Sequence, residues 1–507
     1  MFQKVLVANR GEIAVRILRT IRELGVRTVA VHSPVDSGAL HVQTADEAVA
    51  LAGDAPAESY LDGAAIIEAA RSSGAQAIHP GYGFLAENSG FARAVEDAGL
   101  VFIGPKADVI AQLGDKPTAR RLLAAAGVPI IPGLMAPETD PVRLAAAAAD
   151  IGFPVLIKAA AGGGGKGMRV VEDPAQLASA AAEASGEART AFGDGSIYLE
   201  RYLPRTRHVE IQILADGQGR VVHLGERECS VQRRHQKIIE ETPCPAPFFD
   251  AALRERMGAA AVAAAKTVGY TNAGTVEFLL ADSGQFYFLE VNTRLQVEHP
   301  VTELVYGLDL VRHQLEIAAG APLGLRQEDI APRGHALECR IYAEDPAAGF
   351  MPSPGKVLFH RPAAGPFVRF DSGICSGAEV PVSYDPILGK LITWAEDRPL
   401  AIARMERALC ENVILGVHTA TEYLLDVMAH PAFRAGETHT RFLEEHFAAW
   451  APDGARAARQ AALAFASADL LGLARTATPG APRGAAQGAE PFPSPWQTLW
   501  GFDSARG

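Results

Sequence analysis

Polar side chains recur at every second position just after residue 289. The set is Glu290, Asn292, Arg294, Gln296 and Glu298, and it follows a strand-like run, Gln285-Phe-Tyr-Phe-Leu-Glu290. While the backbone stays extended, this spacing directs the side chains to one face of a strand. Carboxylates, amides and a guanidinium in one space are costly to bury without a ligand. The pattern therefore predicts a site for a divalent metal, an anion and a proton acceptor.

An earlier apolar run supplies a second strand beside this one. Residues 273–280 are strand-like, and Ala-Asp-Ser-Gly at 281–284 is typical of a hairpin loop. Pairing of Leu280 with Gln285 would make Glu277 a diagonal neighbour of Glu290, with alpha carbons about 7–8 Å apart. Carboxylates at that separation can converge on Mg²⁺. The alternative is a pair of solvent-facing acids, and the Arg-x-Gln-x-Glu-His continuation favours a site.

A glycine run in the middle of the chain predicts a phosphate lid. Residues 162–165 are all glycine, and Lys166 and Gly167 follow. Glycine lets backbone N–H groups approach phosphate oxygens closely. Glycine instead of Ser or Thr after Lys166 excludes a Walker A loop. Because Lys158 and Lys166 flank the run and a strand resumes at 168–171, a mobile lid is favoured over a flexible linker.

A concentrated basic segment, Gln232-Arg-Arg-His-Gln-Lys237, stands out in an acidic chain. A solvated run of charge is the ordinary interpretation. Beside a metal and phosphate site, the same segment can complement the charge of a phosphate-bearing ligand and of a small anion. His235 and Lys237 are the strongest candidates, whereas Arg233 and Arg234 suit structural ion pairs.

The elements that must position these residues are predicted from periodicity. In the first part, short apolar runs alternate with helical segments, which implies a parallel, Rossmann-like sheet. Helical spacing predicts a helix over residues 13–24. Gly81-Tyr-Gly-Phe-Leu-Ala86 matches a dinucleotide-binding pattern, but no suitable acid follows, so a nicotinamide cofactor is not expected. A tight turn explains that motif equally well.

The pattern changes after Gly320. Strands are expected at residues 336–342, 357–360 and 367–370, and helices at 398–411 and 419–429. Glu338 and Arg340 share strand parity, so Arg340 can point inward beside a carboxylate; a structural salt bridge is the alternative. Residues 473–490 are rich in Ala, Gly, Pro and Arg, which is typical of a linker.

Composition sets outer bounds on the class of protein. A chain of 507 residues is too long for one core. A net charge of −12 argues against a dedicated nucleic-acid binder. The five cysteines lie far apart, which favours a reducing, cytoplasmic compartment over disulfides or a zinc cluster. No apolar run reaches about 18 residues, and no signal peptide precedes Val5, so no membrane span is expected.

Ordered motifs of the chain resemble those of biotin carboxylases, over residues 1–447. They are Ala8-Asn-Arg-Gly-Glu-Ile-Ala14, His79-Pro-Gly-Tyr-Gly-Phe-Leu-Ala-Glu-Asn88, Gly162-Gly-Gly-Gly-Lys-Gly-Met168, Arg233-Arg-His-Gln-Lys237, Asn292-Thr-Arg-Leu-Gln-Val-Glu-His-Pro-Val-Thr-Glu303 and Glu338-Cys-Arg340. The resemblance implies an α/β and α+β multidomain fold. Its parts are a Rossmann-like N-terminal domain (1–113), an ATP-grasp domain (114–333, with a lid near 132–203), a mixed C-terminal domain (334–447) and a linker-like tail (448–507).

The resemblance also implies roles for individual residues. The metal ligands would be Glu277, Glu290 and Asn292. Bicarbonate and biotin would be handled by Lys237, Arg294, Gln296, the Val297 backbone, Glu298 as proton acceptor and Arg340 as partner of the biotin enolate. Residues expected to contact ATP or biotin are Tyr82, Gly83, Lys116, Lys158, Gly163, Gly164, Gly165, Lys166, Glu200, Arg201, Leu203, His208, Gln232, His235 and Leu279. Lysine is usual in the family at the Arg201 position, where the contact is expected through the backbone.

The implied reaction is ATP-dependent carboxylation of biotin by bicarbonate through carboxyphosphate, with Mg²⁺ or Mn²⁺. No Met-Lys-Met attachment motif occurs. Biotin is therefore expected on a separate carrier protein, unless this chain is a fragment of a longer one. Carboxyltransferase subunits of an acyl-CoA carboxylase and a second copy of the chain, in a homodimer, are the further expected partners. Neither nucleic acid nor a membrane is expected. The alternatives are a carbamoyl-phosphate type of ATP-grasp ligase and a noncatalytic ATP-binding assembly subunit. A noncatalytic subunit is disfavoured because the chain retains all the residues that the resemblance implies for catalysis and metal binding. A carbamoyl-phosphate type of ligase is disfavoured by the Gln-Val-Glu-His-Pro run.

Overall fold

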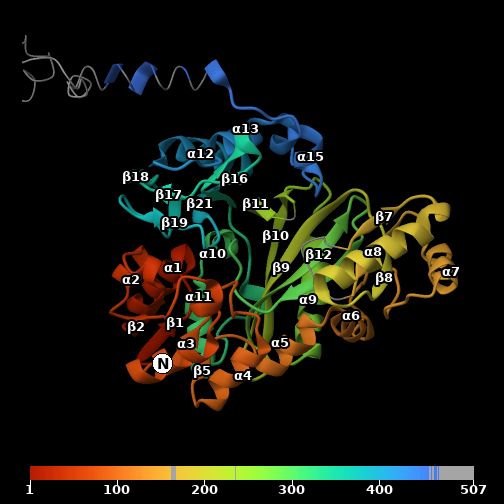
Figure 1. Ribbon diagram of the computed structural model, residues 1–507, viewed down its shortest axis with the longest axis horizontal. Coiled ribbons are helices and arrows are strands. Elements are labelled where there is room, and N and C mark those ends of the chain that lie inside the picture. Colours follow the sequence, from red (N-terminus) through yellow and green to blue (C-terminus); the bar gives the residue numbers. More distant parts are fainter. Residues whose placement is uncertain (161–166, 235, 456–457, 459–461, 465, 468–507) are drawn as a thin grey trace, which may run out of the picture. The chain divides into compact units, whose positions relative to one another are not determined.

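The computed structural model describes residues 1–467 except 161–166, 235, 456–457, 459–461 and 465 (Figure 1). Compact units span Met1–Ala451 and Pro452–Gly507. The expected linker at 473–490 lies outside the described residues. Within the described part of the chain, no helix combines the length and the apolar composition needed to cross a bilayer.

A parallel sheet forms the N-terminal part, as the alternating pattern predicted. Its order is β3-β2-β1-β4-β5, built from β1 (Lys4–Val7), β2 (Arg27–His32), β3 (Glu47–Ala50), β4 (Ala77–His79) and β5 (Val101–Phe102). The alternation of side chains along β1 sends Val5 and Val7 to the core shared with α1 (Gly11–Glu23) and α11 (Leu310–Ala318). Leu6 packs on the opposite face against α3 (Gly63–Ser73) and α4 (Ser89–Asp97).

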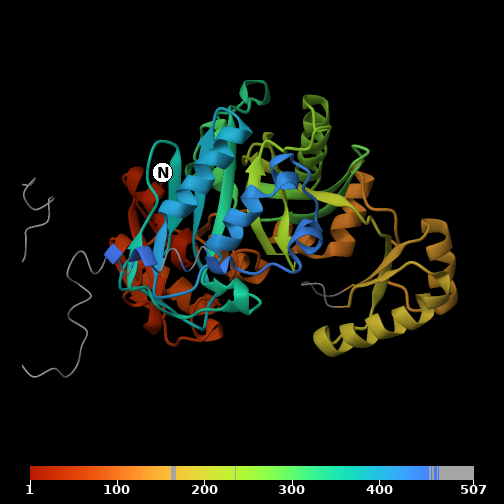
Figure 2. The same ribbon diagram turned by 90° about the horizontal axis from the view of Figure 1, so that it is seen from above.

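A small antiparallel sheet forms a lobe with its own core (yellow in Figure 2). Its order is β7-β6-β8, from β6 (Val155–Ala159), β7 (Arg169–Val171) and β8 (Ile197–Arg201). Helices α7 (Pro141–Ile151) and α8 (Leu177–Phe192) pack on it through Leu144 and Ala184. The predicted lid residues Gly163, Gly164, Gly165 and Lys166 lie outside the described residues.

An eight-stranded antiparallel sheet carries the candidate site. Its order is β13-β12-β9-β10-β11-β14-β21-β19. The strands are β9 (Thr206–Ala215), β10 (Val221–Arg233), β11 (Gln236–Thr242), β12 (Asn272–Ala281), β13 (Phe286–Asn292), β14 (His335–Tyr342), β19 (Val368–Ser372) and β21 (Ile387–Ala395). Strand β14 pairs directly with β11, so the regions expected to form the ATP-grasp domain and the C-terminal domain share one continuous sheet.

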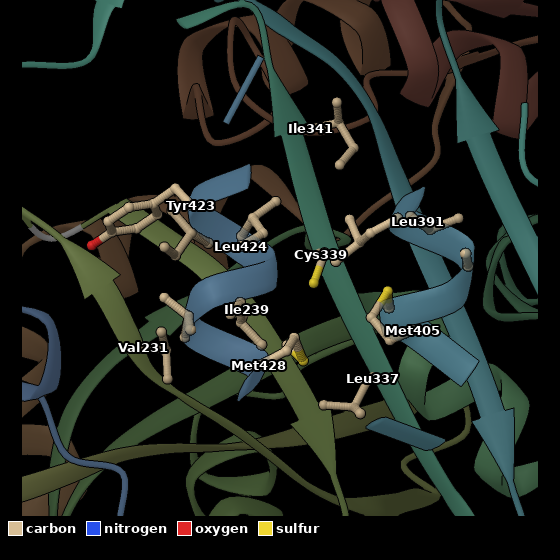
Figure 3. Packing of buried hydrophobic residues seen from close by; sticks show 14 of the residues in the cluster. Val231, Ile239, Leu337, Cys339, Ile341, Leu391, Met405, Tyr423, Leu424 and Met428 are labelled. Atoms are coloured by element: carbon tan, nitrogen blue, oxygen red, sulfur yellow. The ribbon is translucent and has the colours of Figure 1, made fainter. Parts of the chain in front are cut away.

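Helices pack on this sheet and contribute to two hydrophobic cores, one toward each end of the strand order. Near β9 and β12, α5 (Ala107–Gly114), α6 (Lys116–Ala125) and α9 (Ala251–Thr267) supply core residues. At the other end, Figure 3 shows Cys339 of β14 beside Met405 of α12 (Arg398–Glu411) and Met428 of α13 (Thr421–Ala429). Ile239 of β11 belongs to the same cluster, so this core also crosses the β11–β14 pairing.

The remaining elements are short. They are α2 (Leu40–Thr44), α10 (His299–Tyr306), α14 (Pro431–Arg434), α15 (Phe442–Phe447), β15 (Glu344–Asp345), β16 (Met351–Pro352), β17 (Gly355–Lys356), β18 (Phe359–Arg361), β20 (Glu379–Val380) and β22 (Val413–Leu415).

Candidate active site

Two of the three predicted metal ligands, Glu277 and Glu290, face each other directly across the β12–β13 hairpin. Glu277 pairs with Glu290, and the register shifts between Glu277 and Phe278. The predicted diagonal arrangement was wrong for two reasons. The hairpin closes with Ala281 N–H donating to the Gln285 carbonyl, one residue later than expected, and a bulge then moves Glu277 opposite Glu290.

The predicted extended backbone from residue 290 to residue 298 was also wrong. Strand β13 ends at Asn292, and residues 296–299 form a turn in which His299 N–H donates to the Gln296 carbonyl over 3.3 Å. The side chains of Asn292 and Gln296 still converge, because both are hydrogen-bonded to Glu277. Asn292 Nδ2 and Gln296 Nε2 donate to Glu277 Oε1 over 2.7 and 2.9 Å.

Lys237 is the central cation of the site. Its ammonium group lies 2.5 Å from Glu210 Oε2, 2.7 Å from Glu298 Oε1 and 3.1 Å from Glu277 Oε1. Burial disfavours the charge, but these carboxylates help to raise the pKa of Lys237 well above its usual value. A permanently charged lysine beside ionised acids can hold a small anion.

The predicted basic segment belongs largely to strands β10 and β11. Gln232 pairs with Lys237 across β10 and β11, and Arg234 adopts a φ of 48° in the turn. Arg233 binds Glu344 over 2.8 Å, as expected of a structural ion-pair partner. His235 lies outside the described residues.

Glu298 is a buried, ionised carboxylate between two cations. It accepts hydrogen bonds from Lys237 Nζ, which lies 2.7 Å from Oε1, and from Arg340 Nη2, which lies 3.0 Å from Oε2. Burial opposes its ionisation, but Lys237, Arg340 and Arg227 outweigh this and hold the pKa of Glu298 well below its usual value. The group is therefore available as a proton acceptor at neutral pH.

Arg340 points inward, as its strand parity predicted. Its Nε donates to Glu240 Oε1 over 2.6 Å, so the hydrogen-bonded carboxylates are Glu240 and Glu298. The neighbour expected beside it, Glu338, is fully buried, and this burial raises its pKa well above the usual value.

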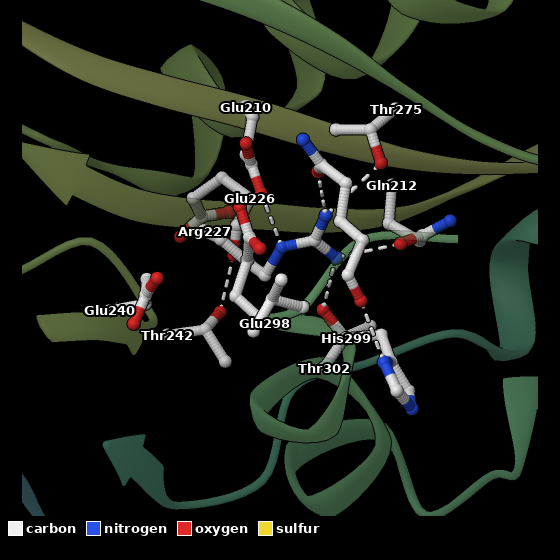
Figure 4. A network of polar contacts seen from close by, with 12 residues as sticks. Glu210, Gln212, Glu226, Arg227, Glu240, Thr242, Thr275, Glu298, His299 and Thr302 are labelled. Carbon is white, nitrogen blue, oxygen red and sulfur yellow. Dashed lines mark hydrogen bonds and ion pairs between the residues drawn. The ribbon is translucent and has the colours of Figure 1, made fainter. Parts of the chain in front are cut away.

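Below the site, the fully buried Arg227 organises the acids and amides (Figure 4). Its guanidinium donates to Glu210, Gln212, Thr275, Gln296 and Thr302 over 2.5–3.1 Å. Neither Arg227 nor Glu210 was predicted as a site residue. The available signal was Glu-Arg-Glu at 226–228, a charged run in a strand that is otherwise apolar enough to be buried.

The candidate metal ligands differ in their surroundings. Glu277 Oε2 lies 2.9 Å from His208 Nε2. Burial favours the neutral imidazole, yet Glu277 raises the pKa of His208 above its usual value. Glu290 is 38% exposed and lies 3.2 Å from Lys116. Two opposed carboxylates suit Mg²⁺, and the accessible Glu290 can bind it without leaving a buried partner unpaired.

The side chains of Arg294 and Asn292 are hydrogen-bonded to each other. Arg294 Nη2 donates to Asn292 Oδ1 over 3.0 Å, and its Nε donates to Glu87 Oε2 over 2.9 Å. Glu87 was not predicted, although it lies within the His79–Asn88 motif. In this arrangement, the amide oxygen of Asn292 is directed at Arg294.

The predicted nucleotide residues come from the lobe, from helix α6 and from the central sheet. Lys158 Nζ lies 2.5 Å from Glu200 Oε2. Lys116 begins α6, Arg201 ends β8 with its side chain exposed, and Leu203 follows. Leu279 pairs with His208 across β12 and β9.

The predicted biotin contacts lie beside the N-terminal sheet. The Tyr82 hydroxyl donates to Glu12 of α1. Gly83 is exposed, and its φ of 66° is a conformation that favours glycine.

Comparison with known proteins identifies the class and then the family. Residues 115–326 match the carbamoyl-phosphate synthase L chain, ATP binding domain, which places the site in an ATP-grasp protein. Residues 1–110 and 338–445 match the N-terminal and C-terminal domains of biotin carboxylase. The chain belongs to the biotin carboxylase family.

Individual relatives cover nearly all of the larger unit. The biotin carboxylase of Nostoc sp. is 52% identical over 447 residues, which are 88% of this chain and 99% of the relative. A pyruvate carboxylase component from Methanothermobacter thermautotrophicus is 52% identical over 446 residues, 88% of this chain and 90% of the relative.

Solved structures agree with this relationship. A Campylobacter jejuni biotin carboxylase complex superposes with a TM-score of 0.84 at 45% identity, covering 88% of this chain and 99% of that one. The biotin carboxylase domain dimer of Hydrogenobacter thermophilus 2-oxoglutarate carboxylase, solved with MgADP and bicarbonate, gives 0.83 at 46% identity, with 88% and 98% covered.

Proposed function

We propose that this chain carboxylates biotin with bicarbonate and ATP, the first half-reaction of a biotin-dependent carboxylase. The observation that carries the proposal is the ionised Glu298 held between Lys237 and Arg340. The arrangement places a proton acceptor between a cation able to hold bicarbonate and a guanidinium able to hold a second substrate.

The nucleotide would lie between the lobe and the central sheet. Lys116, Lys158 and the glycine segment 163–166 would hold its phosphates, and Glu200, Arg201, Leu203, His208, Gln232, His235 and Leu279 would surround it. Glu277 and Glu290, with Asn292, would hold Mg²⁺ or Mn²⁺, which neutralises phosphate charge when bound.

The chain's own residues then move one proton and stabilise one anion. Bicarbonate is held by Lys237, Arg294, Gln296 and the Val297 backbone. Glu298 accepts its proton, so that the oxygen attacks the γ-phosphate of ATP; the bond to the bridging oxygen breaks and ADP leaves. The resulting carboxyphosphate breaks into CO₂ and phosphate. Phosphate takes the N1 proton of biotin, and Arg340 stabilises the enolate oxygen that forms. Carbon dioxide then joins N1. Tyr82 and Gly83 would contact the biotin ring.

Biotin is proposed to arrive on a separate carrier protein, because the chain contains no Met-Lys-Met triplet. Carboxyltransferase subunits of an acyl-CoA carboxylase would receive the carboxyl group, and the chain would act in the cytoplasm as a homodimer. Similar proteins include parts of pyruvate and 2-oxoglutarate carboxylases. Transferases for those acceptors therefore belong in any search for the partner.

ATP consumption with and without bicarbonate and free biotin tests the reaction. Consumption that requires both supports the proposal. Consumption that needs bicarbonate and ammonia, but not biotin, indicates the carbamoyl-phosphate type of ligase. Failure to consume ATP under every combination, in a folded protein that binds ATP, indicates an assembly subunit.

A biotinylated carrier tests the separate-carrier proposal. It should raise turnover well above that with dilute free biotin, because transient docking raises the effective concentration of biotin to the millimolar range or thereabouts. Mass spectrometry that finds biotin covalently attached to this chain would contradict the proposal.

A further inference from the structure

Lys390, in the middle of β21, is fully buried and has no place in the reaction described above. An ammonium group is costly to remove from water unless charged or polar partners surround it. Lys390 pairs with Arg340 on β14 and with Asp371 on β19. It therefore lies one strand away from the β19 edge of the eight-stranded sheet.

Two contacts account for the burial of Lys390. Its Nζ donates to the Val297 carbonyl over 2.6 Å and lies 3.3 Å from Glu12 Oε2. Val297 directly precedes the proposed base, and Glu12 belongs to the N-terminal motif Ala8–Ala14, to which the reaction gives no role. One ammonium group therefore bridges the base-bearing turn and α1.

The carbonyl of Val297 is the central peptide oxygen of the turn at 296–299. His299 N–H closes that turn on the Gln296 carbonyl, and Glu298 has φ −81° and ψ 9°. These angles match the third position of a type I turn, near −90° and 0°. The alternative type II turn rotates the central peptide by about 180° and needs a positive φ at the third position.

Lys390 opposes that rotation. A rotated peptide would turn the Val297 carbonyl away from the ammonium group. The buried carbonyl would lose its partner, and Lys390 would keep Glu12 alone. Glu298 would also have to enter a region of φ that few residues other than glycine adopt. The observed turn directs Glu298 to Lys237 and Arg340.

The same lysine reaches the biotin side of the site. Glu12 accepts a hydrogen bond from the Tyr82 hydroxyl, and Lys390 Nζ lies 5.9 Å from the centre of the Tyr82 ring. A continuous chain of contacts thus runs from Tyr82 through Glu12 and Lys390 to Val297.

We propose that Lys390 is a positioning residue that fixes the turn carrying Glu298 and links this turn to Tyr82. The roles of Glu298 and Tyr82 rest on the proposed function; the control of the turn by Lys390 does not. The lysine touches no reacting atom and acts through the peptide next to the base.

A double-mutant cycle tests this action. Lys390→Met should lower biotin-dependent ATP consumption by about 10- to 100-fold in the native background, but by less than about twofold when combined with Glu298→Gln, because coupled residues are not additive. Arg398→Met, which removes a partly buried cation paired with the buried Glu241, is the matched control and should act equally in both backgrounds. Equal factors for Lys390→Met in the two backgrounds would overturn the proposal.

A second measurement does not depend on activity. Hydrogen exchange across residues 296–301 should become faster in Lys390→Met than in the native protein under conditions where both are folded, and Arg398→Met should leave it unchanged. Unchanged exchange in Lys390→Met contradicts control of the turn. If Lys390→Met does not fold, Glu12→Gln with Lys390→Met removes both charges of the buried pair and is measured instead.

These outcomes separate the inference from the proposed function. A native protein that does not consume ATP with biotin overturns the proposed function, while the exchange experiment still decides the role of Lys390. An active native protein with additive effects overturns the role of Lys390 alone.

Discussion

Lys237 and Glu298 are paired directly, with Nζ 2.7 Å from Oε1. The proposed anion-binding cation and the proposed base thus neutralise each other within the site. Bicarbonate must share Lys237 with Glu298, and this weakens the contact that holds the pKa of Glu298 low. The base therefore becomes a better proton acceptor when its substrate is bound.

Glu298→Gln should lower biotin-dependent turnover by about 10²–10⁴-fold, because glutamine cannot accept the proton of bicarbonate. ATP affinity should stay close to native, since the hydrogen bonds of Glu298 go to Lys237 and Arg340. Steady-state kinetics and nucleotide titration measure both quantities, with the exposed Glu444→Gln as control. Near-native turnover would remove Glu298 from this role.

The two opposed acids should differ when each is replaced. Glu290→Gln should raise the Mg²⁺ concentration needed for half-maximal activity without lowering the melting temperature, because Glu290 is 38% exposed and faces only Lys116 among its ion-pair partners in the described residues. Glu277→Gln should raise the Mg²⁺ requirement and also lower the melting temperature, because Lys237 and His208 would lose the negative charge with which they are paired. A Mg²⁺ titration together with thermal unfolding tests this. Equal losses of stability would contradict the assignment.

Arg227→Lys should destabilise the protein by about 3–5 kcal/mol, because lysine cannot reproduce a planar set of donors to several buried partners. Arg407→Lys changes an arginine that is 79% exposed and should stay within about 0.5 kcal/mol of the native protein. Urea unfolding of both variants gives the comparison. A small effect at Arg227 would show that the network in Figure 4 adapts to a smaller cation.

The buried Glu241 should make stability depend on pH. Burial opposes its ionisation, but Arg398 and His335 lower its pKa to about 2. Because the folded pKa lies below the unfolded value of about 4.3, its contribution is complete above that value and is lost as pH falls toward 2. The destabilisation by Glu241→Gln should therefore be full at pH 7 and shrink below about pH 5. Urea midpoints at several pH values measure it, with the exposed Glu379→Gln as control; a constant difference would contradict the argument.

Local patterns predicted the parallel N-terminal sheet, because strands and helices there follow one another within short stretches of chain. The resemblance to biotin carboxylases also led to the site cluster, because Lys237, Glu298 and Arg340 lie in its motifs and Glu277 lies on the predicted hairpin strand. The structure brings these four together from β12, β11, the turn before α10 and β14.

Features that depend on distant pairing were not predicted. The bulge beside Phe278 and the turn at 296–299 arise from hydrogen bonds that no periodicity encodes. Lys390 resembles an ordinary strand residue, and Arg227 was missed despite the Glu-Arg-Glu run around it. The importance of both comes from carboxylates and a carbonyl brought in from other parts of the chain.

The pairing of β11 with β14 makes residue 333, where a domain boundary was expected, a poor place to divide the chain. A fragment ending there would expose the hydrogen-bonding groups of β11 along an open sheet edge, which is a template for aggregation. Such a division would also leave Lys237 and Glu298 on one piece and Arg340 on the other. Neither piece would then hold the complete set of proposed catalytic residues. Recombination or protein engineering must therefore move this sheet as one unit.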